Sequence, residues 1–326
     1  MMQLATAVKE YTLSHVETFH DTNFYEEVIN GLTSYPRTIP PKFFYDKRGS
    51  QLFDAICETP EYYPTRTEKA ILEKNLTAIS QYITPDCILI EPGCGSCEKV
   101  RPLLTHNPPH TYVPMDISGD YLQSIAQNLS REFPSINIHP ACIDYTSPLT
   151  LPFATGDRRR VAFFPGSSIG NFEPNEAISF LENIANMVGR QGGLLIGVDL
   201  KKNEDVLNKA YNDASGVTAK FNKNLLNRIN NELNGQVNVE KFKHHAYYNR
   251  DKSRIEMHLV STTNQVVTIN ETDFNFEKGD SIHTENSYKY TIEEFHSLAK
   301  QAGFQAFDCW LDDEALFSIH YLVRPN

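Results

Sequence analysis

Basic residues are scarce in this sequence: 30 Lys and Arg stand against 41 Asp and Glu, which gives a formal net charge of -11. Contacts with phosphate groups need clustered Lys and Arg, so this balance argues against nucleic acid and anionic membranes as partners. Apolar runs are also short, and none approaches the ~20 residues that span a bilayer. A secretory signal is missing too, because Lys9 and Glu10 stand where an apolar segment is expected. We therefore expect no membrane and no nucleic-acid partner.

Cysteine is sparse as well, with six in 326 residues, and this number does not predict a disulfide framework. Cys94 and Cys97 form a Cys-x-x-Cys pair, but a zinc site of that type needs a second pair, and the sequence has none. A redox pair at the start of a helix is an alternative. We interpret both cysteines as small residues of a loop and predict no metal. The cysteine usage and the missing signal favour the reducing cytoplasm.

What the sequence does contain is a regular alternation of strand and helix patterns between residues 67 and 200. Hydrophobic residues make up 40% of the chain, enough for a buried core. Short apolar runs predict strands at 87–90, 112–115, 136–143, 161–164 and 193–200. Apolar residues at helical spacing predict helices at 68–82, 121–133 and 175–187. This alternation predicts an α/β fold with a doubly wound, mostly parallel sheet.

The pattern changes after residue 200. A polar helical stretch interrupted at Gly216, two strand patterns, a helix and two final strands follow at 204–233, 254–261, 266–269, 291–303, 304–310 and 315–323. The last three segments resemble the first pattern again. We therefore predict an α/β domain formed by 67–200 and 288–326. A smaller α+β substrate-binding domain, formed by 1–66 and 201–287, would pack on it.

The first strongly apolar strand leads into a glycine-rich loop, Glu91-Pro92-Gly93-Cys94-Gly95-Ser96. Glycines let the backbone approach a ligand and expose N–H groups at the start of a following helix. The next strand ends in Asp116, where a carboxylate can accept both hydroxyls of a ribose. The third strand ends in Asp144 followed by Tyr145, an acid and a ring that suit an adenine. Three ordinary turns at strand ends are the alternative interpretation.

Two kinds of cofactor compete for this loop. A dinucleotide would need a third glycine three residues after Gly95, where Glu98 stands, and its pyrophosphate would be repelled by Glu91 and Glu98. A cationic sulfonium cofactor has neither difficulty. The pattern Glu-x-Gly-x-Gly, with acids at the next two strand ends, resembles the class I (Rossmann-like) methyltransferases that use S-adenosylmethionine.

Longer motifs make the resemblance more specific. They are PKFFYDKRGS at 41–50, PEYYPTRTE at 60–68, FPGSSIGNF at 164–172, AYND at 210–213 with GVTA at 216–219, and HTENS at 283–287. In this order, over nearly the whole chain, they resemble the L-histidine Nα-methyltransferases of ergothioneine biosynthesis. That family has fungal relatives that methylate indole-bearing amino acids. The resemblance implies S-adenosylmethionine as methyl donor and hercynine, the trimethylated betaine of histidine, as product.

The resemblance also implies roles for individual residues. The cofactor contacts would be Gly93, Lys99, Asp116, Asp144 and Tyr145. The amine and carboxylate of the amino acid would be held by Tyr62, Asn171 and Tyr211. Tyr45 and the Gly166 carbonyl would lie near the amine, so that the catalytic group would be Tyr45, Asn171 and Gly166. The ring would be held by Glu285 and Ser287, with Asn286 between them, and its pocket would be lined by Met257.

The chemistry independently favours these residue types. Methyl transfer is an in-line displacement that depends on positioning, and the attacking nitrogen must be neutral. A histidine ring offers N–H donors, which the Glu285 carboxylate and the Ser287 hydroxyl can accept. An apolar residue at position 285 would favour an indole instead.

We therefore predict a monomeric enzyme that carries out three S-adenosylmethionine-dependent Nα-methylations of L-histidine, the first step of ergothioneine biosynthesis. One alternative is an N-methyltransferase for another aromatic amino acid such as tryptophan. The other is a non-catalytic protein that senses S-adenosylmethionine or an amino acid.

Overall fold

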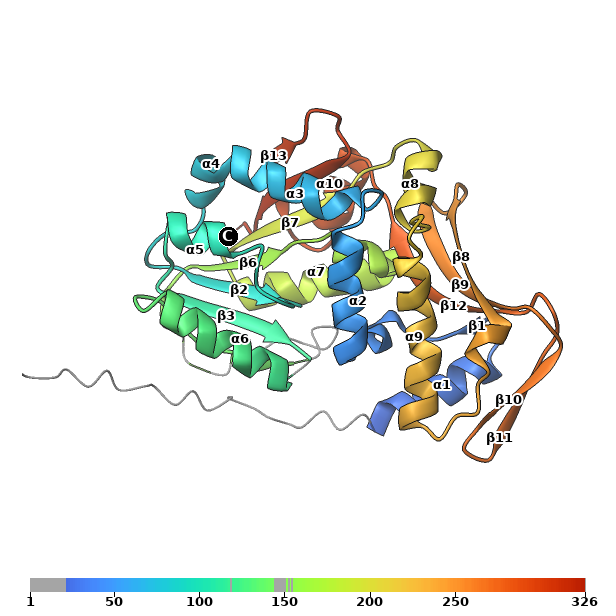
Figure 1. Cartoon of the computed structure of the whole chain (residues 1–326). Helices are drawn as coiled ribbons and strands as arrows, with labels where there is room; N and C mark the ends of the chain where they lie inside the picture. The colour runs from blue at the N-terminus through green and yellow to red at the C-terminus, as the bar shows by residue number, and fades with distance from the viewer. Residues whose placement is uncertain (1–21, 118, 144–150, 152, 154, 326) are drawn as a thin grey trace, which may run out of the picture.

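A mostly parallel sheet forms the larger part of the molecule (Figure 1). The computed structural model describes residues 22–117, 119–143, 151, 153 and 155–325. Within them, an eight-stranded sheet has the order β13-β14-β7-β6-β2-β3-β4, with β5 also paired to β3. The strands are β2 (Ile88–Pro92), β3 (Thr111–Asp116), β4 (Asn137–Ile138), β5 (Ala141–Cys142), β6 (Arg160–Phe164), β7 (Gly193–Asp199), β13 (Gln305–Leu311) and β14 (Phe317–Val323). Only β13 and β14 run antiparallel to their neighbours. This confirms the predicted class I α/β fold.

Helices cover both faces of this sheet because its strands are apolar on both sides. One face packs against α7 (Pro174–Val188) and α10 (Ile292–Gln301) in a single hydrophobic cluster. The other face packs against α3 (Tyr63–Lys74), α4 (Leu76–Ser80), α5 (Arg101–His106) and α6 (Gly119–Glu132). The helix predicted at 68–82 is divided at Asn75, which caps α4.

A second, smaller sheet lies beside the first, on the right in Figure 1. Its order is β1-β12-β9-β8, and a separate hairpin joins β10 to β11. The strands are β1 (Arg37–Thr38), β8 (Phe242–Asn249), β9 (Arg254–Ser261), β10 (Gln265–Ile269), β11 (Thr272–Phe276) and β12 (Ser281–Tyr288). The accompanying helices are α1 (Thr22–Thr33), η1 (Pro41–Phe44), α2 (Lys47–Cys57), η2 (Ser168–Asn171), α8 (Glu204–Ala210), α9 (Val217–Glu232) and η3 (Val239–Lys241).

The hydrophobic cores follow this arrangement. One cluster gathers residues between Phe24 and Tyr63 with residues between Leu207 and Ile282, and two others lie on the two faces of the large sheet. The separate cores support the predicted division into two domains, which we retain as a proposal. Among the helices of the described residues, none is both long and apolar enough to cross a membrane.

Candidate active site

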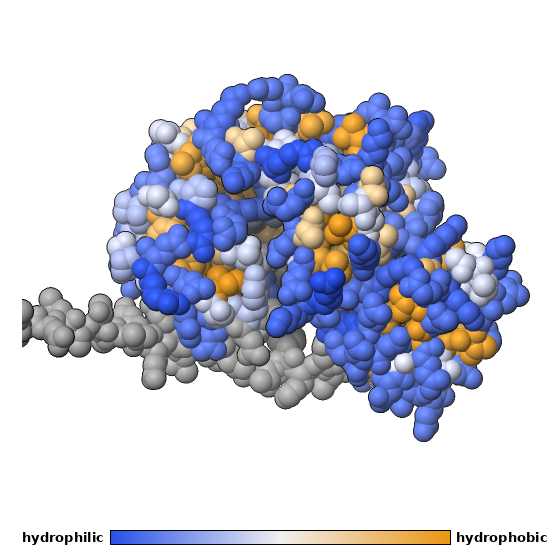
Figure 2. All heavy atoms as spheres, in the orientation of Figure 1, coloured by the Kyte–Doolittle hydropathy of each residue, from blue (hydrophilic) through white to orange (hydrophobic). Residues whose placement is uncertain are grey.

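A polar cavity opens where the two sheets meet, and Figure 2 shows that the surface is hollowed between the corresponding parts of the molecule. The segment after β6 and the end of β7 form one side, and β12 forms another. The lining residues are Tyr45, Phe53, Tyr62, Pro64, Gly166, Ser167, Ser168, Asn171, Asp199, Tyr211, Glu285, Ser287 and Lys289. The cavity therefore brings together seven residues that the sequence predicts for the site: Tyr45, Tyr62, Gly166, Asn171, Tyr211, Glu285 and Ser287.

Four aromatic rings form one wall of this cavity. Tyr45 and Phe53 meet edge to face with ring centroids 5.7 Å apart, Phe53 and Tyr62 at 6.3 Å, and Tyr62 and Tyr211 at 6.1 Å. Burial raises the pKa values of Tyr62 and Tyr211, so both phenols stay neutral at physiological pH. Neutral rings of this kind attract an ammonium group through their faces.

The segment after β6 brings Asn171 to the cavity. Gly166 has φ +85°, which favours glycine, and the short helix η2 then ends at Asn171. Gly170 lies so close to β12 that a Cβ atom would be 2.7 Å from the Tyr288 carbonyl oxygen. In the described part of the chain, the Asn171 side-chain amide has no hydrogen-bond partner. Both ends of this amide are therefore available to a ligand.

Glu68 ties this segment to the cofactor loop. Its buried carboxylate accepts the Gly166 N–H at 2.8 and 3.0 Å and pairs with Lys99 Nζ at 2.7 Å. Lys99 Nζ therefore lies close to Gly166, at the edge of the cavity. Glu68 belongs to one of the sequence motifs, but the sequence did not indicate this bridging role.

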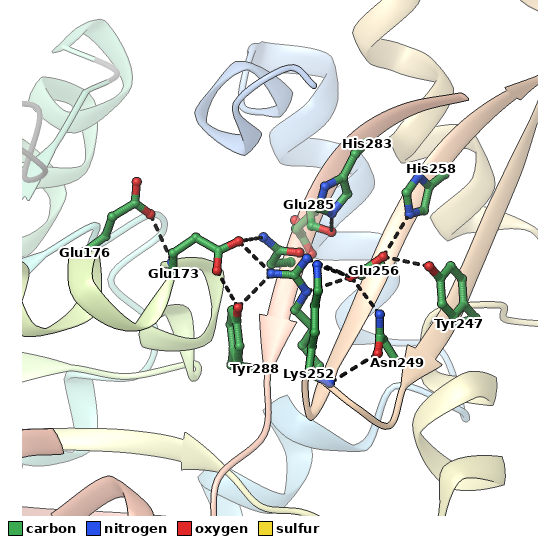
Figure 3. A network of polar contacts seen from close by, with 12 residues as sticks. Glu173, Glu176, Tyr247, Asn249, Lys252, Glu256, His258, His283, Glu285 and Tyr288 are labelled. Atoms are coloured by element: carbon green, nitrogen blue, oxygen red, sulfur yellow. Dashed lines mark hydrogen bonds and ion pairs between the residues drawn. The ribbon is translucent and has the colours of Figure 1, made fainter. Parts of the chain in front are cut away.

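The opposite end of the cavity is charged. Glu285 lies there without a hydrogen-bond partner among the described residues, and Figure 3 shows it on β12. Burial raises the pKa of this carboxyl to about 7, against the opposing effect of Lys289. Beside it, Ser287 accepts hydrogen bonds from Tyr211 and Lys289, each at 2.8 Å. This end thus presents a carboxylate without a donor, which is the complement of a ligand N–H group.

The sequence analysis did not predict the buried ion pairs of Asp199 that lie next to this end of the cavity. Lys289 and Lys202 each lie 2.6 Å from the Asp199 carboxylate, and the Tyr63 hydroxyl donates to it. The Asp199 backbone N–H also donates to Ser167 at 2.8 Å. The only sequence signal was that Asp199 ends an apolar strand on the side where the other acids lie.

Two predicted ring contacts do not line the cavity. Asn286 alternates with Glu285 and Ser287 along β12 and instead donates to Glu173, in the network that Figure 3 shows. Met257 is opposite Glu285 on β9 and is 1% exposed within the hydrophobic core. Their proposed contacts with substrate are therefore not visible in this arrangement.

On the outer face of the small sheet, Glu256, His258 and His283 form a group of metal-binding side chains (Figure 3). Arg254 already neutralises Glu256 at 2.7 Å. The two imidazole rings stack with centroids 4.7 Å apart, and the Nε2 atom of His283 already contacts the Glu285 carbonyl oxygen at 3.1 Å. We assign no metal to this group.

The loop after β2 has the shape expected for a cofactor. Gly93 and Gly95 have φ values of +65° and +51°, and open space lies where a Gly95 Cβ would be. The Gly95 N–H donates to Asp116 at the end of β3, at 3.0 Å. Burial raises the pKa of Glu91 to about 8, which favours the neutral form of this buried acid at neutral pH. An open backbone beside the Asp116 carboxylate suits the ribose of S-adenosylmethionine.

The remaining predictions for this region concern two residues after the third strand and the two cysteines of the loop. Asp144 and Tyr145 lie outside the described residues. Cys94 and Cys97 are buried and free, and burial raises the pKa of Cys94 well above its usual value. A protonated, buried thiol is a poor nucleophile, which disfavours the redox alternative.

Replacing Asp116 by asparagine is expected to weaken binding of S-adenosylhomocysteine about 10- to 100-fold. Asparagine keeps an acceptor for Gly95 but loses the charge, and a hydrogen bond to a charged group contributes about 1.5–3 kcal/mol. Isothermal titration calorimetry measures the change. Glu98→Gln is the matched control, because Glu98 is exposed in the same segment and, among the described residues, its only ion pair is with Arg101. Equal Kd values for the two variants would contradict a role for Asp116.

Comparison with known proteins identifies the family. A family model described as a histidine-specific, S-adenosylmethionine-dependent methyltransferase matches residues 24–324. The chain is 37% identical to a histidine N-alpha-methyltransferase of Mycolicibacterium smegmatis and 36% identical to one of Mycobacterium tuberculosis, over 91% of this chain and 94% of each relative. It is 26% identical to a 4-dimethylallyltryptophan N-methyltransferase of Claviceps purpurea, with the same coverage. The chain therefore belongs to the histidine-specific methyltransferases, and its methyl donor is S-adenosylmethionine.

Proposed function

We propose that this enzyme transfers three methyl groups in succession to the α-amine of L-histidine and so makes hercynine, the first step of ergothioneine biosynthesis. The observation that carries the proposal is the Glu285 carboxylate, which lies without a donor in a cavity otherwise lined by aromatic and amide side chains. A histidine ring has the N–H group that such a carboxylate requires. An indole also has one N–H, but only a histidine ring adds a second polar nitrogen, which the polar end formed by Glu285 and Ser287 can accommodate.

Different residues of the cavity would bind different parts of the substrate. Asn171, with Tyr45 and the Gly166 carbonyl, would orient the amine, while Tyr62 and Tyr211 would hold the amino-acid backbone. S-adenosylmethionine supplies an electrophilic methyl group. None of these side chains is a cation, so they do not oppose the positive charge that develops on the attacking nitrogen. The aromatic wall would then stabilise the quaternary ammonium of the product.

The experiment that tests this function is mass spectrometry of the purified protein after incubation with S-adenosylmethionine and an equimolar mixture of amino acids. We expect histidine alone to gain one, two and three methyl groups. Methylation of tryptophan or another amino acid would overturn the assigned substrate. Binding of S-adenosylmethionine without any methylated product would favour the sensor alternative. Action as a cytoplasmic monomer stays a prediction.

The pKa of Glu285 predicts a pH dependence. Burial raises it to about 7, so the ionised carboxylate that accepts the ring N–H becomes predominant only as the pH rises through neutrality. We expect kcat/KM for histidine to rise between about pH 6 and 8, beyond what ionisation of the substrate itself causes. In Glu285→Gln this extra rise should disappear, and kcat/KM at pH 8 should fall about 10- to 100-fold. Parallel pH profiles for the two enzymes would contradict the assignment.

A further inference from the structure

Lys289 is a buried cation whose hydrogen bonds are fully used. It is 1% exposed, and its ammonium group contacts Asp199 at 2.6 Å, Ser287 Oγ at 2.8 Å and the Tyr211 hydroxyl oxygen at 3.2 Å. An ammonium has three N–H donors and no acceptor, so these contacts fix the direction of every hydrogen bond that it makes. Burial disfavours its charge, but Asp199 outweighs this effect and raises the pKa of Lys289. The lysine is therefore charged throughout the physiological pH range.

The direction of these bonds decides what the Ser287 hydroxyl can do. A hydroxyl has two lone pairs and one hydrogen. One lone pair of Ser287 accepts from Lys289, and the other accepts from Tyr211, whose own oxygen is occupied by Lys289. The hydroxyl hydrogen of Ser287 is used by neither of these bonds. Because Ser287 lines the cavity, this hydrogen can be donated to a ligand there. This differs from the sequence-based expectation that Ser287 accepts an N–H from the ring.

Glu285 and Ser287 then form an unlike pair at the charged end of the cavity. The Glu285 carboxylate offers only acceptors, whereas the Ser287 hydroxyl offers a donor. We propose that Lys289, held by Asp199, is a positioning residue that makes Ser287 donate into the cavity, so that Glu285 and Ser287 together select a ring with one N–H and one bare nitrogen. This deepens the proposed function and rests on it, because the ring in question is the neutral imidazole of histidine.

The proposal predicts which rings are rejected. An indole or pyrrole has an N–H for Glu285 but only carbon where Ser287 needs an acceptor. An imidazolium has two N–H groups, and the second would face the Ser287 hydrogen. A site that leaves a buried donor without a partner discriminates more strongly than one that only loses apolar contact. Lys289 would thus set ring specificity without touching the ring.

The test compares L-histidine with the two pyrrolylalanine isomers, each of which keeps one N–H and replaces the other ring nitrogen by C–H. For wild-type enzyme we expect kcat/KM for histidine to exceed that for the better isomer by about tenfold or more. In Lys289→Met, Ser287 regains a free lone pair, and this ratio should fall about tenfold toward unity. The change should appear in KM and in the Kd of histidine, measured by calorimetry with S-adenosylhomocysteine present, more than in kcat.

Lys202→Met is the matched control. Lys202 is a second nearly buried partner of Asp199, also at 2.6 Å, but among the described residues it contacts neither Ser287 nor Tyr211. This variant should keep the wild-type ratio. Equal losses for histidine and the isomers in Lys289→Met would show a merely structural role and overturn the proposal. A wild-type enzyme that methylates no histidine would instead overturn the proposed function.

A second variant keeps the proposal testable if Lys289→Met does not fold. Ser287→Ala removes the donor itself and should lower the ratio as much as Lys289→Met. Combining the two substitutions should then add little, because both act through the same hydrogen atom. An unchanged ratio in Ser287→Ala would overturn the proposal whatever the behaviour of the lysine variant.

Discussion

Replacing Asn171 by alanine is expected to lower kcat for histidine methylation by about 10²-fold or more, while the protein remains folded. Loss of alignment at the reacting atom alone can cost that much in an in-line displacement. The Asn171 amide is the group that the segment after β6 brings to the cavity without any partner in the described residues. Single-turnover kinetics with bound S-adenosylmethionine would measure the methyl-transfer step directly.

Asn175 provides the control for this substitution. It lies exposed in the first turn of α7, a few residues further along the chain. Asn175→Ala should leave both kcat and the thermal midpoint close to wild type. If Asn171→Ala reduced only the affinity for histidine and left the single-turnover rate unchanged, Asn171 would be a binding residue and not a catalytic one.

Replacing Asp199 by alanine is expected to cost about 3–5 kcal/mol in the free energy of unfolding. The substitution leaves Lys289 and Lys202 nearly buried without their shared carboxylate, and removing one partner of a buried ion pair has this order of effect. The Tyr63 hydroxyl also loses its acceptor. Urea denaturation of the purified variant would measure the loss as a lower midpoint at an unchanged slope.

The exposed ion pair between Lys74 and Asp313 provides the control for this substitution. Its distance is also 2.6 Å, but the two side chains are 61% and 88% exposed. Solvent screens such a pair, so Asp313→Ala should change the free energy of unfolding by no more than about 1 kcal/mol. Similar small losses in both variants would mean that the Asp199 cluster relaxes or takes up water, and that its burial is not what holds the lysines.

The large sheet could be predicted from the sequence because strands buried on both faces have continuous apolar runs, as in β2 and β6. The predicted strand at 136–143 is wrong in one respect: it is divided into β4 and β5, because Pro140 between them has no N–H for the ladder. The small sheet was predicted only in part. The strand β12 has no apolar alternation, since it presents polar residues to the cavity and to the Glu173 network.

The residues of the candidate site, like the strands, were predicted only in part. The family motifs pointed to Tyr62, Asn171 and Glu285, which the cavity brings together from distant segments. They did not point to Asp199 and Lys289 as a pair. A buried charge is acceptable only beside its partner, and no local pattern shows which partner the fold will supply. The proposed donor role of Ser287 depends on this ion pair, so it could not be predicted from the sequence.

One further consequence follows from Glu68. The same buried carboxylate holds Lys99, which follows the glycine-rich loop, and the N–H of Gly166, which lines the cavity. If the cofactor contacts Lys99, as the sequence predicts, its binding would change the ion pair of Glu68 and with it the hydrogen bond to Gly166. Thermodynamic linkage makes the effect mutual: whatever factor the cofactor applies to the affinity for the amino acid, the amino acid applies to the affinity for the cofactor. We therefore expect the two substrates to be coupled heterotropically through Glu68.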